Sequence, residues 1–251
     1  MKNFSKSQFA GTDPLELLKK AGGFYERRGN GPLVAYAGTY KCFGETKPYV
    51  GEHYVNFGMV ERHGALLAYL ARQLLVKALG ELREVGKGDL LTHATGFCAA
   101  PEGGKALAVS LAYQGSEVEG CTCDEYIYPR KLSSKRDSPL IFDRHVPEEG
   151  KTYWIVDDTY HNGSTIDKMV PLIEKCGASV AGVLCFFNRS MTTEHSHVVG
   201  ECKRIPLISL VRKYIPQFKQ EDKRVVDDVL AGNVYFDPKT NWRGLLKTMG
   251  Q

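Results

Sequence analysis

Segments with the composition of strands and of helices alternate along the chain between residues 89 and 210. Runs rich in apolar and β-forming residues, which are typical of strands, cover 89–96, 119–128, 153–156, 179–188 and 204–210. Segments with helical periodicity cover 102–115 and 164–177. Strands separated by helices of about ten to fifteen residues indicate crossover connections. The sequence therefore predicts an α/β fold with a central, mainly parallel sheet flanked by helices, in which ligands bind beyond the carboxyl ends of the strands.

Other elements are expected on either side of this alternation. "TDPLELLKKAGGF" predicts a short helix, because Pro14 suits a first turn and the Gly pair at 22–23 suits a helix end. Residues 36–58 predict a small antiparallel hairpin, and residues 59–82 a long helix facing the core. The end of the chain indicates an amphipathic helix and a tail anchored by Trp242. The expected parts are 1–60, an α/β core at 61–210, and a helical tail at 211–251.

The composition is that of a globular protein. Of the 251 residues, 43% are hydrophobic and 25% are charged, so the chain can bury a substantial core. No apolar run approaches the roughly 20 residues of a membrane span, and the first residues lack the apolar segment of a secretory signal. We therefore expect a cytoplasmic protein with no membrane partner. The seven scattered cysteines favour reduced thiols, and a net charge of +4 is too small to indicate a nucleic-acid partner.

Residues 153–165, "YWIVDDTYHNGST", join an apolar run to two acids and a small polar turn. If the apolar run is a buried strand, Asp157 and Asp158 fall at its carboxyl end and residues 163–165 open the next helix. The first turn of a helix offers unpaired N–H groups and the positive end of the helix dipole, which suit a phosphate. Two carboxylates beside it suit neutral hydroxyls or a divalent cation. A sugar phosphate meets both requirements.

Two other interpretations fit the acid pair. An Asp pair at a strand end is often a helix cap beside a solvated carboxylate. A receiver-type phosphoacceptor site also uses an acid pair, but places it much earlier in the chain.

The motif resembles the signature of the type I phosphoribosyltransferases, in which four apolar residues and two acids precede a small turn ending in Gly-x-Thr. The match is good at 153–158 and at 163–165. Between them the family has an aliphatic residue and small Thr or Ala residues, whereas this chain has Thr159, Tyr160, His161 and Asn162. Because Tyr160 and His161 are bulky for a phosphate-binding turn, either the turn is widened or the ligand differs.

Two further segments resemble motifs of that family. "THATGFCAAPEGGKALA" resembles its pyrophosphate loop, in which Gly103 and Gly104 let the backbone approach the ligand. The long segment 129–150 resembles the flexible basic loop of the orotate phosphoribosyltransferases, which reaches into the neighbouring subunit's site. Its basic residues are Arg130, Lys131, Lys135, Arg136 and Arg144. Cations that close over a leaving pyrophosphate lower the barrier, and this role is carried onto Arg130, Lys131 and Lys135. A solvated basic loop is the alternative.

Two stretches resemble the base-binding elements of the orotate subgroup. "KPYVGEHYVNFG" resembles an element whose aromatic ring stacks on the pyrimidine, with Tyr54 and Asn56 in matching positions. "AGVLCFFNRS" resembles a strand end whose arginine pairs with the carboxylate of the base; Arg189 matches it, and Asn188 replaces an Asp. A guanidinium fork suits a planar carboxylate. The resemblance spans roughly residues 12–210.

The resemblance implies an enzyme that transfers ribose 5-phosphate from phosphoribosyl pyrophosphate to a pyrimidine base, with orotate as the first candidate. It implies that Asp157 and Asp158 orient the ribose and act in catalysis with the basic loop. The 5-phosphate would lie on Asn162, Gly163, Ser164 and Thr165. It also implies Mg²⁺ as cofactor, with no protein residue assigned as its ligand, a homodimer, and residues 1–60 as a hood over the base.

Two alternatives to this function stay open. The accepted base could be another one, or the chain could be a non-catalytic regulator that binds phosphoribosyl pyrophosphate or a nucleotide. His195 and His197 have no partner at metal-ligand spacing, so we expect them on a surface loop.

Overall fold

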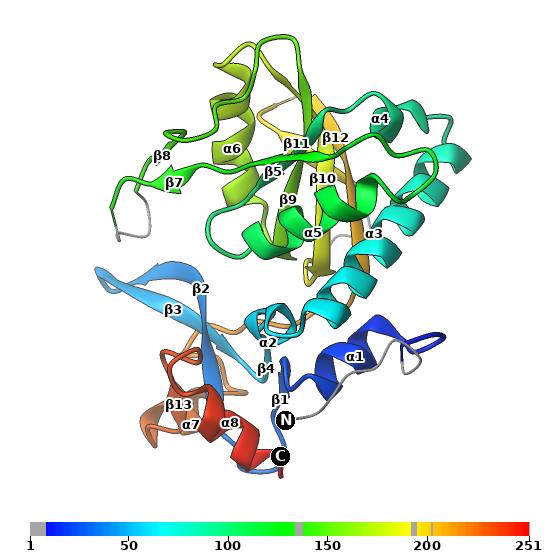
Figure 1. Cartoon of the computed structure of the whole chain (residues 1–251). Coiled ribbons are helices and arrows are strands. Elements are labelled where there is room, and N and C mark those ends of the chain that lie inside the picture. Colours follow the sequence, from blue (N-terminus) through cyan, green and yellow to red (C-terminus); the bar gives the residue numbers. More distant parts are fainter. Residues whose placement is uncertain (1–8, 134–137, 192–194, 202, 251) are drawn as a thin grey trace. The chain divides into compact units, whose positions relative to one another are not determined.

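The computed structural model describes residues 9–133, 138–191, 195–201 and 203–250 (Figure 1). The chain divides into two compact units. The first comprises Met1–Pro14 and Glu61–Lys213, and the second comprises Leu15–Val60 and Tyr214–Gln251. Two short helices, α1 at Pro14–Lys20 and α2 at Gly58–Glu61, lie where the chain passes from one unit to the other.

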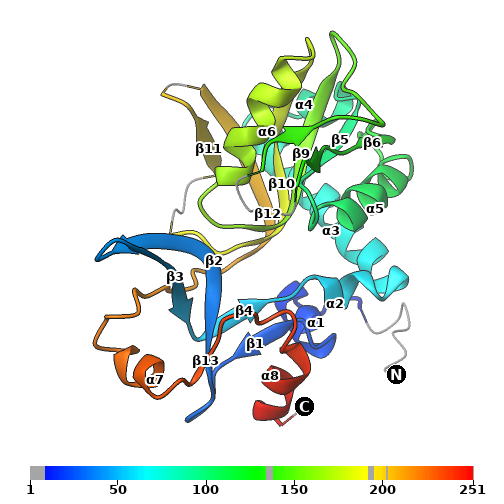
Figure 2. The same cartoon turned by 90° about the vertical axis from the view of Figure 1, so that its left-hand side faces the viewer.

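A six-stranded sheet forms the centre of the first unit, in the order β11-β12-β10-β9-β5-β6 (Figure 2). Its strands are β5 (Gly96–Ala99), β6 (Glu125–Ile127), β9 (Thr152–Tyr160), β10 (Ser179–Asn188), β11 (Ser196–Val199) and β12 (Lys203–Arg212). Five of them run parallel, and the edge strand β11 pairs antiparallel with β12. The α/β fold with a mainly parallel sheet predicted from the sequence is confirmed.

Helices cover both faces of this sheet (Figure 2). They are α3 (Gly64–Glu84), α4 (Asp89–Thr92), α5 (Lys105–Gly115) and α6 (Ser164–Glu174). α3 and α5 lie on one face, and α6 lies on the other. In α3 the buried leucines Leu67, Leu70 and Leu74 recur at helical spacing, which is why this helix packs along its length.

The chain order of the strands creates a switch point between β5 and β9. From β5 the chain passes through α5 to β6 on one side of β5, and then crosses to β9 on the other side. Connections that leave two neighbouring parallel strands in opposite directions open a crevice at their carboxyl ends, where α/β proteins bind ligands. The segment between β6 and β9 carries a small two-stranded arm, β7 (Arg130–Lys131) paired with β8 (Leu140–Ile141).

The second unit joins residues from both ends of the sequence. β2 (Leu33–Cys42) and β3 (Glu45–Gly51) form the predicted hairpin, β13 (Val234–Tyr235) adds to β2, and β1 (Phe24–Glu26) pairs with β4 (His53–Val55). Besides most of α1 and α2, it contains the helices α7 (Val226–Leu230) and α8 (Trp242–Thr248). The buried Trp242 ring donates from Nε1 to the Gly22 carbonyl at 3.0 Å, so the expected aromatic anchor of the tail is present. The role of residues 1–60 as a hood stays a prediction.

Three predicted elements differ from the structure. Of the strand expected over 119–128, only Glu125–Ile127 is a strand. The run 89–96, expected to be a strand, begins as the helix α4, and the strand starts only at Gly96. Short apolar runs do not distinguish a strand from a buried helical turn, and Leu91 is fully buried in this turn. The long helix expected from 59 is interrupted before Gly64, because His63 has φ −118° and ψ 86° and caps α3. Across the residues with assigned positions, no helix is both long and apolar enough to cross a membrane.

Candidate active site

The acid pair lies inside strand β9, at the switch point. β5 pairs with β9 only as far as Val156, whereas β10 continues to pair with it as far as Tyr160. The strand expected over 153–156 continues to Tyr160, because pairing with β10 extends β9 beyond the end of its other neighbour, so the two acids lie in its carboxyl-terminal half and not at its last residues. Both acids are held on a paired strand and are only partly covered.

The glycine pair brings the loop after β5 against this acidic strand. A Cβ atom at Gly103 would lie 2.5 Å from Oδ1 of Asp158, so only glycine leaves the Asp158 carboxylate in place. At Gly104 a Cβ would overlap the Val156 carbonyl oxygen. The same carbonyl accepts a hydrogen bond from the Ala100 N–H at 2.7 Å. Two segments far apart in the sequence, expected to serve one ligand, are thus in contact.

The surroundings of Asp157 disfavour its charged form. Burial, followed by the charge of neighbouring Asp158, raises the pKa of Asp157 well above its ordinary value. The Asp158 N–H donates to Asp157 Oδ1 at 2.9 Å, which fixes the orientation of that carboxylate. A pair of this kind is stabilised by hydroxyl donors or by a cation, as the sequence predicts.

A three-residue turn, 161–163, joins β9 to α6. Gly163 ends it in the left-handed region, at φ 74°, and α6 begins at Ser164. The Ser164 N–H donates to Asn162 Oδ1 at 3.2 Å. Because Asn162 and Ser164 are both exposed, a phosphate can replace the Asn162 oxygen on this N–H group.

The two bulky residues at the turn are largely covered by the protein. The side chain of Tyr160 is buried in the core beneath α6, where it joins the cluster of Ile166 and Met169. His161 is half-buried, and burial, followed by the charge of Arg189, lowers its pKa to about 4. It is therefore neutral at neutral pH. Arg189, which is 8% exposed, donates its backbone N–H to the Tyr160 carbonyl at 2.9 Å and so lies at the turn.

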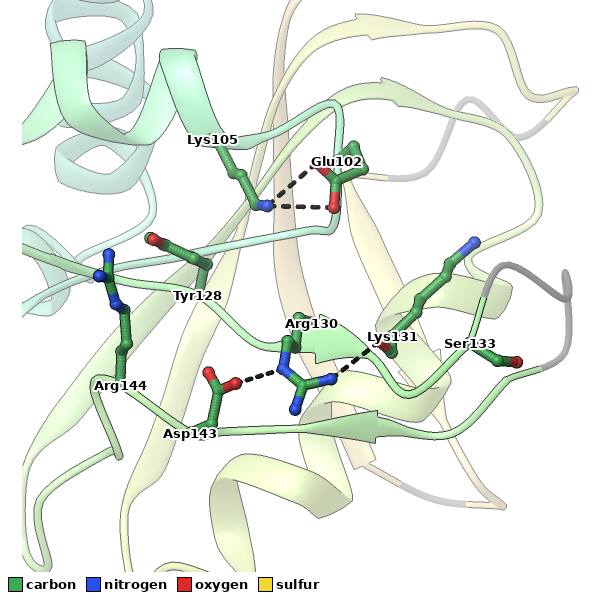
Figure 3. Close-up of a pocket in the computed structure, with 8 residues that line it drawn as sticks. All are labelled: Glu102, Lys105, Tyr128, Arg130, Lys131, Ser133, Asp143 and Arg144. Carbon is green, nitrogen blue, oxygen red and sulfur yellow. Dashed lines mark hydrogen bonds and ion pairs between the residues drawn. The ribbon is translucent and has the colours of Figure 1, made fainter.

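A cationic cavity of about 640 Å³ adjoins the glycine loop (Figure 3). Its lining residues are Glu102, Lys105, Tyr128, Arg130, Lys131, Ser133, Asp143 and Arg144. Lys105 Nζ lies 3.0 Å from both carboxylate oxygens of Glu102 and 4.7 Å from the centroid of the Tyr128 ring, and Arg130 pairs with Asp143. With four cations against two acids, the lining is positive and suits a polyanion.

Some of the basic residues predicted for the loop line this cavity. Arg130 and Lys131, on β7, line the cavity with Arg144, whereas Lys135 and Arg136 lie outside the described residues. Lys105 and Tyr128 were not singled out from the sequence, although Lys105 directly follows the glycine pair and so was the more detectable of the two.

The predicted base-binding residues fall into different units. Tyr54, on β4, and Asn56 belong to the second unit, which is described by itself. The Tyr54 ring lies 6.0 Å from that of Trp242, and the Asn56 N–H donates to the Gly23 carbonyl at 2.8 Å. Because the acid pair belongs to the first unit, the role of Tyr54 and Asn56 in base binding stays a prediction.

One histidine is placed differently from the sequence expectation. His195 is exposed, as expected of a surface loop, but His197 lies on β11 and is only 6% exposed. The surface expectation for His197 is wrong because the ring itself is buried, with the buried Tyr160 and the exposed Asp167 at hydrogen-bond distance from its two nitrogens.

Comparison with solved structures places this architecture in a known fold. The chain has a phosphoribosyltransferase fold. It is similar to the orotate phosphoribosyltransferase from Aeropyrum pernix, with a TM-score of 0.50 and 16% identity over 78% of this chain and 92% of that one. The UMP synthase of Leishmania donovani matches with a TM-score of 0.48 and 14% identity, over 95% of this chain and 42% of that chain. The adenine phosphoribosyltransferase of the same organism matches with a TM-score of 0.48 and 15% identity, over 80% of each chain. No protein-family model and no curated protein matches the sequence.

Proposed function

We propose that this protein is a phosphoribosyltransferase that moves ribose 5-phosphate from phosphoribosyl pyrophosphate to a nucleobase and releases pyrophosphate. The observation that carries the proposal is the contact of Gly103 with the carboxylate of Asp158 at the switch point of the sheet. It joins a loop suited to pyrophosphate to an acid pair suited to a sugar diol. The fold shared with the Aeropyrum pernix enzyme supports it.

The ribose would be held by the acids and the turn. Its hydroxyls donate to Asp157 and Asp158, and its 5-phosphate accepts from the N–H groups of residues 163–165 at the start of α6. Ser164 and Thr165 add hydroxyl donors. Holding both ends of the sugar orients its reacting carbon, which is the main contribution that the protein makes to such a transfer.

The leaving group would be held by the cationic cavity. As the bond to pyrophosphate breaks, negative charge grows on the leaving oxygen, and the positive lining of the cavity stabilises it. Arg130 and Lys131, from the arm, and Lys105, from the start of α5, are the groups proposed for this. No side chain is required as a nucleophile.

The acid pair also fits Mg²⁺, because the charge of Asp158 opposes ionisation of Asp157 and a cation would offset it. Carboxylate oxygens are the protein ligands that Mg²⁺ prefers, with substrate phosphates completing its shell. When bound, the ion lowers the charge on the leaving pyrophosphate.

The accepted base is proposed to be a pyrimidine, with orotate first. Arg189, directly after β10, carries a guanidinium suited to the carboxylate of orotate. Its charge lowers the pKa of His161, which lies in the proposed sugar-binding turn. Action as a homodimer in the cytoplasm is part of this proposal, and so is the stacking of the base on Tyr54 beside Asn56.

Pyrophosphate release measured with a panel of purine and pyrimidine bases tests the function. We expect release with orotate, and its loss in Asp158→Asn although that variant still folds. Pyrophosphate release with another base, and not with orotate, would show that the acceptor is that base and that the protein is still a phosphoribosyltransferase. Thermal stabilisation by phosphoribosyl pyrophosphate without release for any base would contradict catalysis and support a non-catalytic binding protein.

A further inference from the structure

A chain of three polar side chains lies directly beneath the turn that joins β9 to α6. Tyr160 Oη is 2.8 Å from His197 Nδ1, and His197 Nε2 is 3.1 Å from Asp167 Oδ1. Tyr160 precedes the turn, Asp167 lies in the first turn of α6, and His197 comes from the edge strand β11. One imidazole therefore bridges the residues on either side of the turn.

The ring of His197 also supports the turn itself. A Cβ atom at Gly163 would overlap the Cε1 and Nδ1 atoms of His197 and lie 3.0 Å from Tyr160 Oη. The left-handed backbone of Gly163, at φ 74°, is thus packed against the imidazole. Glycine adopts this conformation without strain, and the buried imidazole packed against it limits how far the turn can shift.

The hydrogen bonds define the direction of each donor when the imidazole is neutral. A carboxylate accepts only, so His197 Nε2 carries the hydrogen that Asp167 receives. His197 Nδ1 then accepts from the Tyr160 hydroxyl. Each hydrogen bond fixes the ring in one orientation, so removal of either loosens the support under Gly163.

We propose that His197 is a positioning residue that holds the turn 161–163 in the conformation that binds the 5-phosphate, an inference that rests on the function proposed above. The N–H groups at the start of α6 must converge on one anion, and small changes at Gly163 spread them apart. Since the 5-phosphate is remote from the bond that breaks, loss of this support weakens ground-state and transition-state binding together. The bulky Tyr160 is in this view the partner that orients His197.

The test compares the KM for phosphoribosyl pyrophosphate, kcat, and the thermal shift produced by ribose 5-phosphate. For His197→Ala we expect a KM raised about tenfold with kcat within about twofold, and a correspondingly smaller thermal shift. Tyr160→Phe keeps the buried ring and removes only the hydroxyl, and we expect its KM to rise about threefold. His195→Ala, two residues from His197 but exposed, should behave as the wild type.

The outcomes separate the two levels of the proposal. If the wild type binds ribose 5-phosphate and the folded variants bind it equally well, His197 is only structural and the positioning role is wrong. If the wild type neither binds ribose 5-phosphate nor releases pyrophosphate, the proposed function fails and the positioning role with it. Should His197→Ala not fold, Tyr160→Phe decides: an unchanged KM in that variant overturns the role.

Discussion

Gly103 packs directly against the carboxylate of Asp158, so closely that a Cβ atom would lie 2.5 Å from Oδ1. Its neighbour Gly104 instead packs against the backbone carbonyl of Val156. One glycine therefore makes room for a side chain of the proposed site, and the other makes room for the sheet. We therefore expect a substitution at Gly103 to affect mainly activity and one at Gly104 to affect mainly stability.

Alanine substitutions at the two glycines should have different effects. In Gly103→Ala the new methyl group displaces the Asp158 carboxylate, so we expect turnover to fall about tenfold or more with a melting temperature within a few degrees of wild type. Gly104→Ala meets backbone, which cannot move aside, and should lower the free energy of unfolding by about 2 kcal/mol or more.

Thermal unfolding and pyrophosphate release, measured on both variants, check this pair. Gly80→Ala is the matched control, because Gly80 is exposed in α3. Apart from its chain neighbours and the adjoining helix backbone, no atom of the described residues lies within 4 Å of the place that its new methyl group would take. This control should gain roughly 0.5–1 kcal/mol. Equal activity in Gly103→Ala and the wild type would contradict the placement of Asp158 in the site.

Asp157→Asn should stabilise the free protein and impair the reaction. Burial and the charge of Asp158 raise the pKa of Asp157, so its carboxylate is held at a cost that the amide avoids. The Asn Oδ1 can still accept from the residue 158 N–H. We expect about 1 kcal/mol more stability in urea unfolding at pH 7, together with slower pyrophosphate release. A destabilised but active variant would show that the acid serves the fold alone.

His161 should make stability depend on pH. Its pKa is about 4 in the folded chain, below the ordinary 6.5, because burial and the charge of Arg189 disfavour the cation. The unfolded chain therefore takes up this proton first, and the contribution of neutral His161 is complete above pH 6.5 and lost as the pH falls toward 4.

Urea unfolding at pH 7 and pH 5 measures this contribution. The wild type should lose roughly 1–2 kcal/mol more than His161→Asn between the two pH values. His195→Asn, at an exposed position, should follow the wild type. Parallel losses in the wild type and His161→Asn would show that the ring is not desolvated.

Lys131→Ala tests the cationic cavity. Lys131 lines it and is exposed, so its removal should leave the melting temperature unchanged. If it stabilises the leaving pyrophosphate, kcat should fall by about a hundredfold. Lys151→Ala is the control. It removes an exposed lysine that precedes β9, at the end of that strand opposite to the acid pair, and should not affect kcat. If kcat is the same in both variants, Lys131 does not take part in the reaction.

The sequence predicts the sheet better than it predicts the site. Buried apolar runs such as 179–188 coincide with β10, because a strand covered on both faces needs uninterrupted apolar residues. The acid pair and the glycine pair are recognisable because the chemistry requires their residue types. Their contact is not, since it depends on the crossing of the chain from β6 to β9.

The remaining differences come from tertiary contacts. From the sequence, Tyr160 is too bulky for a phosphate-binding turn. In the structure its side chain is buried beneath α6, with His197 as its hydrogen-bond partner. His197 itself reads as a surface residue, because its two partners lie far from it in the sequence. Lys105 meets Tyr128 and Arg130 only in the folded chain, at the cavity.

A crystal structure with ribose 5-phosphate and Mg²⁺ bound tests the central claim most directly. We predict that the phosphate lies on the N–H groups of residues 163–165, that the sugar hydroxyls bind Asp157 and Asp158, and that Tyr160 stays buried against His197. Density for the sugar away from this turn, with His161 and Asn162 filling the space at the start of α6, would contradict it.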